Sequence, residues 1–165
     1  MASFEVVDEA TLQCTPEEYW AAIVDEFSGR SHWWLPYASV TRRGPEGPSL
    51  EGAVFDVAVN ARGQVERRVG TVRFGWSCTA FEVPSRSVME YVEGPLRGTL
   101  ETTVEPVGTD QTKVSAHLRG RPHGMTGHLL GLVGFAGPHS TVTQAQFPRI
   151  EDYVRDKRAR ESAGT

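Results

Sequence analysis

Residues 15–37, TPEEYWAAIVDEFSGRSHWWLPY, decide how the fold begins, because they hold a complete set of helix start and stop signals. Thr15 suits the N-cap, Pro16 suits the first helical position, and Glu18 completes a capping box. Apolar residues then recur at helical spacing, at Tyr19, Trp20, Ile23 and Phe27. Gly29 ends this predicted helix.

The second half of the stretch, SHWWLPYA at 31–38, predicts a further helix of one or two turns that Pro36 ends. The adjacent Trp33 and Trp34 cannot point the same way on a regular element. One of them is therefore expected in the core and the other near the surface.

The segment before the first helix alternates between apolar and polar residues, which predicts a half-buried strand. The apolar face carries Phe4, Val6, Ala10, Leu12 and Cys14. Asp8 is the one polar member of that face. It could serve as a general base or a ligand anchor if buried, but a carboxylate is costly to bury, so the sequence favours a local irregularity that leaves it in solvent.

Residues 39–121 read almost entirely as antiparallel strands separated by turn signals rich in Gly, Pro and Ser. The predicted strands lie near 38–43, 52–60, 65–83, 87–93, 96–107 and 112–121. Gly75 is expected to bend the long strand at 65–83. The residues after the last strand are predicted to be helical. MTGHLLGLVGF at 125–135 leads to a break at 136–138, and a helix then runs through about 160, in which Pro148 predicts a kink or a restart.

The predicted order is one strand, two short helices, six strands and a long C-terminal helix. A seven-stranded antiparallel sheet with segregated helices defines an α+β fold. A sheet of this size curls, and the C-terminal helix is the only element long enough to fill its concave face. The 165 residues predict a single domain over 1–165, with the last few residues disordered.

Composition excludes several functions. The net charge of −4 and the pI near 5.7 argue against a nucleic-acid surface. Cys14 and Cys78 give neither a disulfide framework nor a zinc spacing. The longest apolar run is too short for a membrane span, and no signal peptide is visible, so we expect a soluble cytoplasmic protein without membrane insertion.

Strand alternation sorts side chains between the two faces of the predicted sheet. The parity of each strand predicts a concave face of Phe55, Val57, Val59, Val72, Phe74, Trp76, Cys78, Ala80, Leu96, Gly98, Leu100, Thr102, Val104, Val114, Ala116 and Leu118, nearly all of them apolar. The opposite parity carries mostly charged residues. Arg73 and His117 fall on this convex face, unless a bulge at Gly70 or Gly75 reverses the alternation.

The element order resembles the SRPBCC superfamily (START/Bet v 1-like, polyketide cyclase/dehydrase). The resemblance rests on the stretch at residues 15–37, on the F-x-V strand within LEGAVFDV, and on a late pattern of spaced residues. That pattern reads Gly98, Glu105, Pro106, Gly108, Thr112 and Val114. It covers essentially the whole chain, is specific for the fold and is nearly silent on activity.

This resemblance implies a helix-grip fold with a deep cavity between the sheet and the C-terminal helix. The second helix would form part of the cavity mouth, with one tryptophan of the pair bordering the entrance beside Tyr37. The residues then expected to bind a ligand are Trp33, Trp34, Tyr37, Phe55, Val57, Val72, Phe74, Trp76, Leu100, Val104, Leu118, Leu129 and Phe135.

Two functions follow from the resemblance. The first is binding of a hydrophobic small molecule, such as a polyketide, lipid or isoprenoid, by a monomer or homodimer without a cofactor. The second is a polyketide aromatase/cyclase, for which Arg73, His117, Tyr91 and Asp8 are the candidate catalytic residues. A protein-interaction module, like some relatives in the superfamily, is a third and weaker interpretation.

The late histidines do not predict a metal site. His123 and His128 are five residues apart, and no carboxylate lies between them. With His117 and His139 they are interpreted as surface or portal residues. Cys78 has no histidine predicted beside it and is interpreted as a small core residue.

Overall fold

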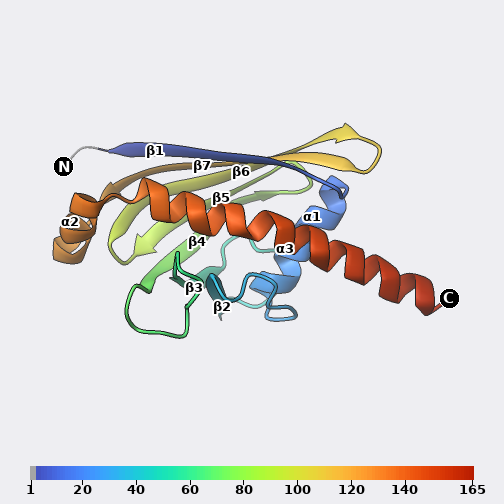
Figure 1. The fold of residues 1–165 in the computed structure, drawn as a ribbon, viewed down its shortest axis with the longest axis horizontal. Helices are drawn as coiled ribbons and strands as arrows, with labels where there is room; N and C mark the ends of the chain where they lie inside the picture. Colours follow the sequence, from blue (N-terminus) through green and yellow to red (C-terminus); the bar gives the residue numbers. More distant parts are fainter. Residues whose placement is uncertain (1–2) are drawn as a thin grey trace.

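A computed structural model describes residues 3–165, and it confirms the helix-grip α+β architecture. A curved seven-stranded antiparallel sheet faces a long C-terminal helix that crosses it diagonally (Figure 1). The elements are β1 (Phe4–Leu12), α1 (Pro16–Phe27), β2 (Ala38–Gly44), β3 (Val54–Val59), β4 (Val72–Glu82), β5 (Arg86–Glu93), β6 (Leu96–Gly108), β7 (Gln111–Pro122), α2 (Gly124–Val133) and α3 (Ala136–Ala163).

The sheet has the strand order β1-β7-β6-β5-β4-β3-β2, so the first and second strands form its two edges. Strands that follow one another from β2 to β7 are also neighbours in the sheet, and β1 adds the last strand by pairing with β7. At Gly98 (φ +145°) an added Cβ would lie 2.0 Å from the Arg119 carbonyl oxygen. Only glycine therefore allows β6 and β7 to approach this closely.

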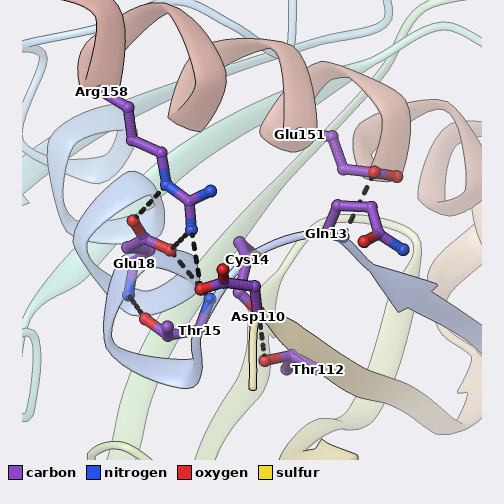
Figure 2. A network of polar contacts seen from close by, with 8 residues as sticks. All are labelled: Gln13, Cys14, Thr15, Glu18, Asp110, Thr112, Glu151 and Arg158. Carbon is purple, nitrogen blue, oxygen red and sulfur yellow. Dashed lines mark hydrogen bonds and ion pairs between the residues drawn. The ribbon is translucent and has the colours of Figure 1, made fainter. Parts of the chain in front are cut away.

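The α1 helix begins as the sequence predicts. The Thr15 hydroxyl accepts from the Glu18 N–H, and the Glu18 carboxylate accepts from the Thr15 N–H, which completes the capping box. Figure 2 shows that the same Glu18 carboxylate pairs with the Arg158 guanidinium of α3, at 2.6 and 2.5 Å. The contact with Arg158 holds the pKa of Glu18 below its usual range. One side chain thus both caps α1 and joins it to α3.

The predicted helix at 31–38 is wrong. Residues 33–37 form turns instead, and the second short helix of the fold is α2, immediately before α3. The buried Glu26 carboxylate accepts the Trp33 N–H at 2.8 Å and the Ser31 hydroxyl at 3.2 Å. Because this backbone N–H is bound by a side chain of α1, the segment follows the surface of that helix rather than forming its own.

The long strand predicted at 65–83 begins only at Val72, and residues 60–71 form a loop. The buried Asn60 organises this loop, because its amide donates to the Gln64 carbonyl oxygen and to the Thr71 hydroxyl, and its carbonyl oxygen accepts the Arg62 N–H. These bonds replace strand pairing for the segment.

The pairing of β4 with β5 has two register shifts, one at Gly75/Trp76 and one at Cys78/Ala80, and only the second changes the alternation of β4. The first lies where Gly75 is predicted to bend the strand. The second turns Ala80 to the convex face opposite Val88, and it turns Phe81 inward against Trp20, with ring centroids 5.6 Å apart. The predicted concave position of Ala80 is therefore wrong.

The C-terminal helices also differ in detail from the prediction. The break falls at Gly134, two residues before the predicted position, and α3 continues through Pro148 as one helix. The helix extends to Ala163, where the sequence predicts disorder. Its buried stripe includes Phe147, Ile150 and Val154, as predicted.

Candidate functional site

An apolar cavity of about 470 Å³ lies between the concave face of the sheet and the helices. Its walls come from α1, from the loop at 60–71, from β4 to β7, and from α2 and the first half of α3. A cavity of this size is within the usual range for small-molecule sites. Among the described residues, no group of His, Cys, Asp and Glu side chains has the arrangement of a metal site.

The room in the cavity comes from a row of small side chains that crosses the sheet. Ser87, Thr102 and Ala116 lie directly opposite one another on β5, β6 and β7, and all three line the cavity. A row of larger side chains, Met89, Leu100 and Leu118, lies next to it on the same face. Because side chains directly opposite each other project from the same face, the row leaves a channel across the sheet.

Seven of the predicted ligand-binding residues lie on the cavity wall: Trp34, Val72, Phe74, Trp76, Leu100, Leu118 and Phe135. The Trp34 indole is held in place because its N–H donates to the Val142 carbonyl oxygen of α3 at 3.2 Å. The turn at 33–37 therefore places Trp34 in contact with the C-terminal helix, as the core member of the tryptophan pair.

Six predicted ligand-binding residues lie off the wall. Phe55, Val57 and Val104 have the predicted parity but are fully buried beneath other side chains. Leu129 is 63% exposed, because α2 turns it to solvent. Phe55, for example, is covered by the Phe27 side chain of α1, with ring centroids 5.1 Å apart. Parity thus identifies the concave face but not which of its residues the helices cover.

The other two displaced residues belong to the turn at 33–37. Trp33 is stacked on Trp34 and donates from its indole to the Ala22 carbonyl oxygen of α1, so it packs on the helix and not at the entrance. Tyr37 lies under the Arg149 guanidinium, 4.8 Å from its ring centroid. Neither side chain lies on the cavity wall.

Two of the four candidate catalytic residues point away from the cavity, as their parity indicates. Arg73 is exposed on the convex face, opposite Ala58 of β3. His117 lies on the same face with its Nε2 3.8 Å from the Glu5 carboxylate. Tyr91 is buried on the cavity wall, where burial raises the pKa of its hydroxyl well above its usual range. Beside it, Trp76 Nε1 has no hydrogen-bond partner within residues 3–165.

Asp8 is buried, which corrects the prediction that it lies in solvent. Its side chain is 6% exposed, and its carboxylate accepts from the Ser140 hydroxyl at 3.1 Å and from the Gln144 amide at 3.2 Å, both on α3. Asp8 lies opposite Ala116, at the end of the row of small side chains. These two hydrogen bonds compensate the burial that the sequence treats as costly.

A histidine of the cavity wall, His139, lies beside Asp8. His139, on the first turn of α3, lines the wall, and its Nε2 lies 3.9 Å from the Asp8 carboxylate and 3.3 Å from the Thr143 hydroxyl. Burial lowers the pKa of His139 below its usual range, and the Asp8 carboxylate partly opposes the shift. Its interpretation as a surface or portal residue is therefore incomplete, because the ring is a neutral, nearly buried base at physiological pH.

Sequence reasoning missed a further part of the wall, which comes from α1 and β5. Tyr19, Trp20, Ile23 and Phe27 form one face of α1, and Met89 joins them from the sheet. The helical spacing of the first four residues does predict one buried face. The sequence does not indicate that this face meets a cavity.

The comparisons with known proteins agree on the fold. No family model and no curated protein matches the sequence. Three solved structures superpose over nearly the whole chain. An aromatase/cyclase, Zhui, from Streptomyces sp. R1128 has 13% identity and a TM-score of 0.66, covering 93% of this chain and 94% of its own. A norcoclaurine synthase point mutant from Thalictrum flavum has 13% identity and a TM-score of 0.66, covering 95% and 97%.

The third is a START superfamily protein from Mycobacterium smegmatis, with 14% identity and a TM-score of 0.62, covering 90% of this chain and 98% of its own. At these identities the likeness establishes the fold alone. The protein therefore has the helix-grip fold of the SRPBCC, or START/Bet v 1-like, superfamily, with an apolar cavity in the position that the resemblance implies.

Proposed function

We propose that this protein binds a hydrophobic small molecule, of the polyketide, lipid or isoprenoid kind, in the cavity between the sheet and α3. The observation that carries the proposal is the cavity itself. It has about 470 Å³ of space, and apolar side chains from the sheet and all three helices line most of it. A few polar groups, such as His139 and Tyr91, stand among them and could orient a ligand.

The proposal is tested by native mass spectrometry of the protein purified from its source cells, together with titration of an uncharged apolar dye such as Nile red. We expect a retained small molecule, or dye binding that lipids or polyketides displace. Recovery of apoprotein alone, with no dye binding or no displacement, would overturn the proposal.

A second candidate function is the cyclisation of a poly-β-keto chain, and the Asp8–His139 pair specifically favours it. The neutral His139 would remove a proton from a carbon between two carbonyl groups. The enolate carbon would attack a second carbonyl carbon, the resulting alkoxide would take up a proton, and loss of water would follow. Asp8 would stabilise the imidazolium formed at the first step. Arg73 and His117 have no part in this version, because they lie on the convex face.

We expect His139→Gln to lower cyclisation in a reconstituted synthase by roughly 100-fold or more, the usual contribution of a general base. Because burial depresses the pKa of His139, the base stays deprotonated down to a pH below its ordinary value of 6.5, and the acidic limb of the rate profile should lie below that pH. His117→Gln is the matched control and should leave the rate unchanged. An unchanged product distribution with His139→Gln would exclude this function.

A further inference from the structure

The cavity opens to solvent between the loop at 60–71 and the junction of α2 and α3. The lining residues that are exposed all come from these two segments: Arg62, Val69, Gly70, Val133, Gly134 and Pro138. In Figure 1 α2 lies at one end of the molecule, away from the β6–β7 hairpin. The loop at 60–71 and the short helix α2 thus border the opening, at the end of the molecule away from that hairpin.

The α2 helix presents its apolar face to solvent. Met125, Leu129, Leu132 and Val133 are 81%, 63%, 78% and 78% exposed, and their spacing places them on one face. The opposite face carries glycine and packs on the sheet. At Gly127 an added Cβ would lie 2.3 Å from the Pro95 carbonyl oxygen. The close contact with Pro95 thus fixes which face of α2 turns outward.

The loop across the opening also exposes an apolar side chain. Val69 is 84% exposed, and with the four α2 residues it forms what we call the mouth patch: Val69, Met125, Leu129, Leu132 and Val133. These five include the most exposed large apolar side chains of the described residues. Val69 and Val133 also line the cavity, so these exposed apolar side chains stand at its mouth. A group of exposed apolar side chains there indicates a surface that another molecule covers.

The charges beside the mouth patch are basic, although the protein as a whole carries a net charge of −4. Arg62, Arg67, Arg68 and Arg121 are exposed, and none forms a side-chain ion pair within residues 3–165, whereas Arg43, Arg119 and Arg158 are each paired with carboxylates. The sequence from 111 to 150, which contains α2, has no Asp or Glu at all. Glu66 is the one acidic residue of the loop.

We propose that the mouth patch docks on an anionic lipid bilayer, with its apolar side chains among the acyl chains and the four arginines on lipid phosphates. An apolar helix face with basic residues beside it is the pattern of interfacial membrane binding. A second copy of this chain fits less well, because a symmetric contact would place the same unpaired arginines against each other. No helix of residues 3–165 is long and apolar enough to cross a membrane, so the contact is peripheral.

Docking in this orientation turns the cavity opening toward the bilayer. A hydrophobic molecule could then pass between the acyl chains and the cavity without crossing water. The docking itself does not depend on the identity of the cavity ligand, nor on whether a ligand is bound.

The test is flotation of the full-length protein with vesicles of phosphatidylcholine, with and without phosphatidylglycerol. We expect binding to the anionic vesicles that weakens as salt is raised. Leu129→Glu with Leu132→Glu should lower the partition coefficient at least about tenfold, because charges replace two leucines that would lie among the acyl chains. Arg67→Gln and Arg68→Gln should each lower it roughly fivefold.

Val107→Glu is the matched control, because Val107 is also an exposed apolar side chain but lies on the β6–β7 hairpin at the far end of the molecule. It should bind vesicles like the unmodified protein. Circular dichroism and Nile red binding in solution should be unchanged in all variants, which separates this inference from the ligand-binding proposal. Absence of binding to anionic vesicles at low salt would overturn the docking proposal. Equal vesicle binding by the double leucine variant would also overturn it. So would a dimer of the unmodified protein that the double leucine variant no longer forms, because the patch would then be a contact between two copies.

Discussion

Replacement of Thr102 by tryptophan should reduce affinity for any ligand of the cavity by about 100-fold while leaving the protein folded. Thr102 lies in the middle of the row of small side chains that crosses the sheet, between Ser87 and Ala116. An indole there would occupy the space of roughly ten ligand atoms. At about 0.3 kcal/mol per atom, their exclusion amounts to roughly 3 kcal/mol, or about two powers of ten in Kd. Titration with Nile red measures the loss.

The control for this variant is the neighbouring position on the same strand. Thr103 points to the convex face, opposite Arg86 and Ser115, so Thr103→Trp adds the same side chain outside the cavity. Its dye affinity should match that of the unmodified protein. Equal affinity for Thr102→Trp and Thr103→Trp would mean that the dye binds elsewhere, and the cavity would lose its assigned role.

Replacement of Phe27 by alanine should lower the free energy of unfolding by about 3–5 kcal/mol. Phe27 is the last residue of α1 and is 4% exposed. Its ring packs against Phe55 of β3 and Trp76 of β4, with centroids 5.1 and 6.2 Å away. Truncation removes both contacts and enlarges the adjoining cavity, which Phe27 lines. Because the neighbouring side chains already border empty space, they cannot move in to replace the lost contacts. Since domains of this size have about 5–15 kcal/mol of stability, the loss is a large share of the total.

Thermal unfolding followed by circular dichroism measures this loss. For a chain of this length each kcal/mol corresponds to about 2–4 °C, so Tm should fall by roughly 6–20 °C. Glu17→Ala, at an exposed position of the same helix, should change stability by less than about 0.5 kcal/mol. A Phe27→Ala protein as stable as the Glu17→Ala protein would show that α1 does not anchor the sheet as described.

Several features of the fold could be predicted because the interactions that make them are local. The capping box of α1 joins residues only three apart, and Thr15 and Glu18 form it as expected. Strand alternation placed Arg73 and His117 on the convex face for the same reason, since neighbouring side chains of a strand must point to opposite faces. The β4 alternation fails only beyond Cys78, where a register shift adds a residue.

The candidate site depended on contacts that no local pattern encodes. Asp8 and His139 are 131 residues apart, and their proximity requires α3 to pack against β1. The sequence shows a carboxylate on an apolar face but not the Ser140 and Gln144 donors that make its burial tolerable. The turn at 33–37 is a similar case, because a side chain of α1 binds the Trp33 N–H that a helix would otherwise use.

The sequence by itself determined the class of fold, the start of α1 and the apolar character of the concave face. These follow from periodicity and capping, which act over a few residues. Only the tertiary structure decided which concave residues line a cavity, which charged groups reach it and where it opens. Those outcomes depend on how the helices are positioned over the sheet, and that position is set by packing between segments more than a hundred residues apart.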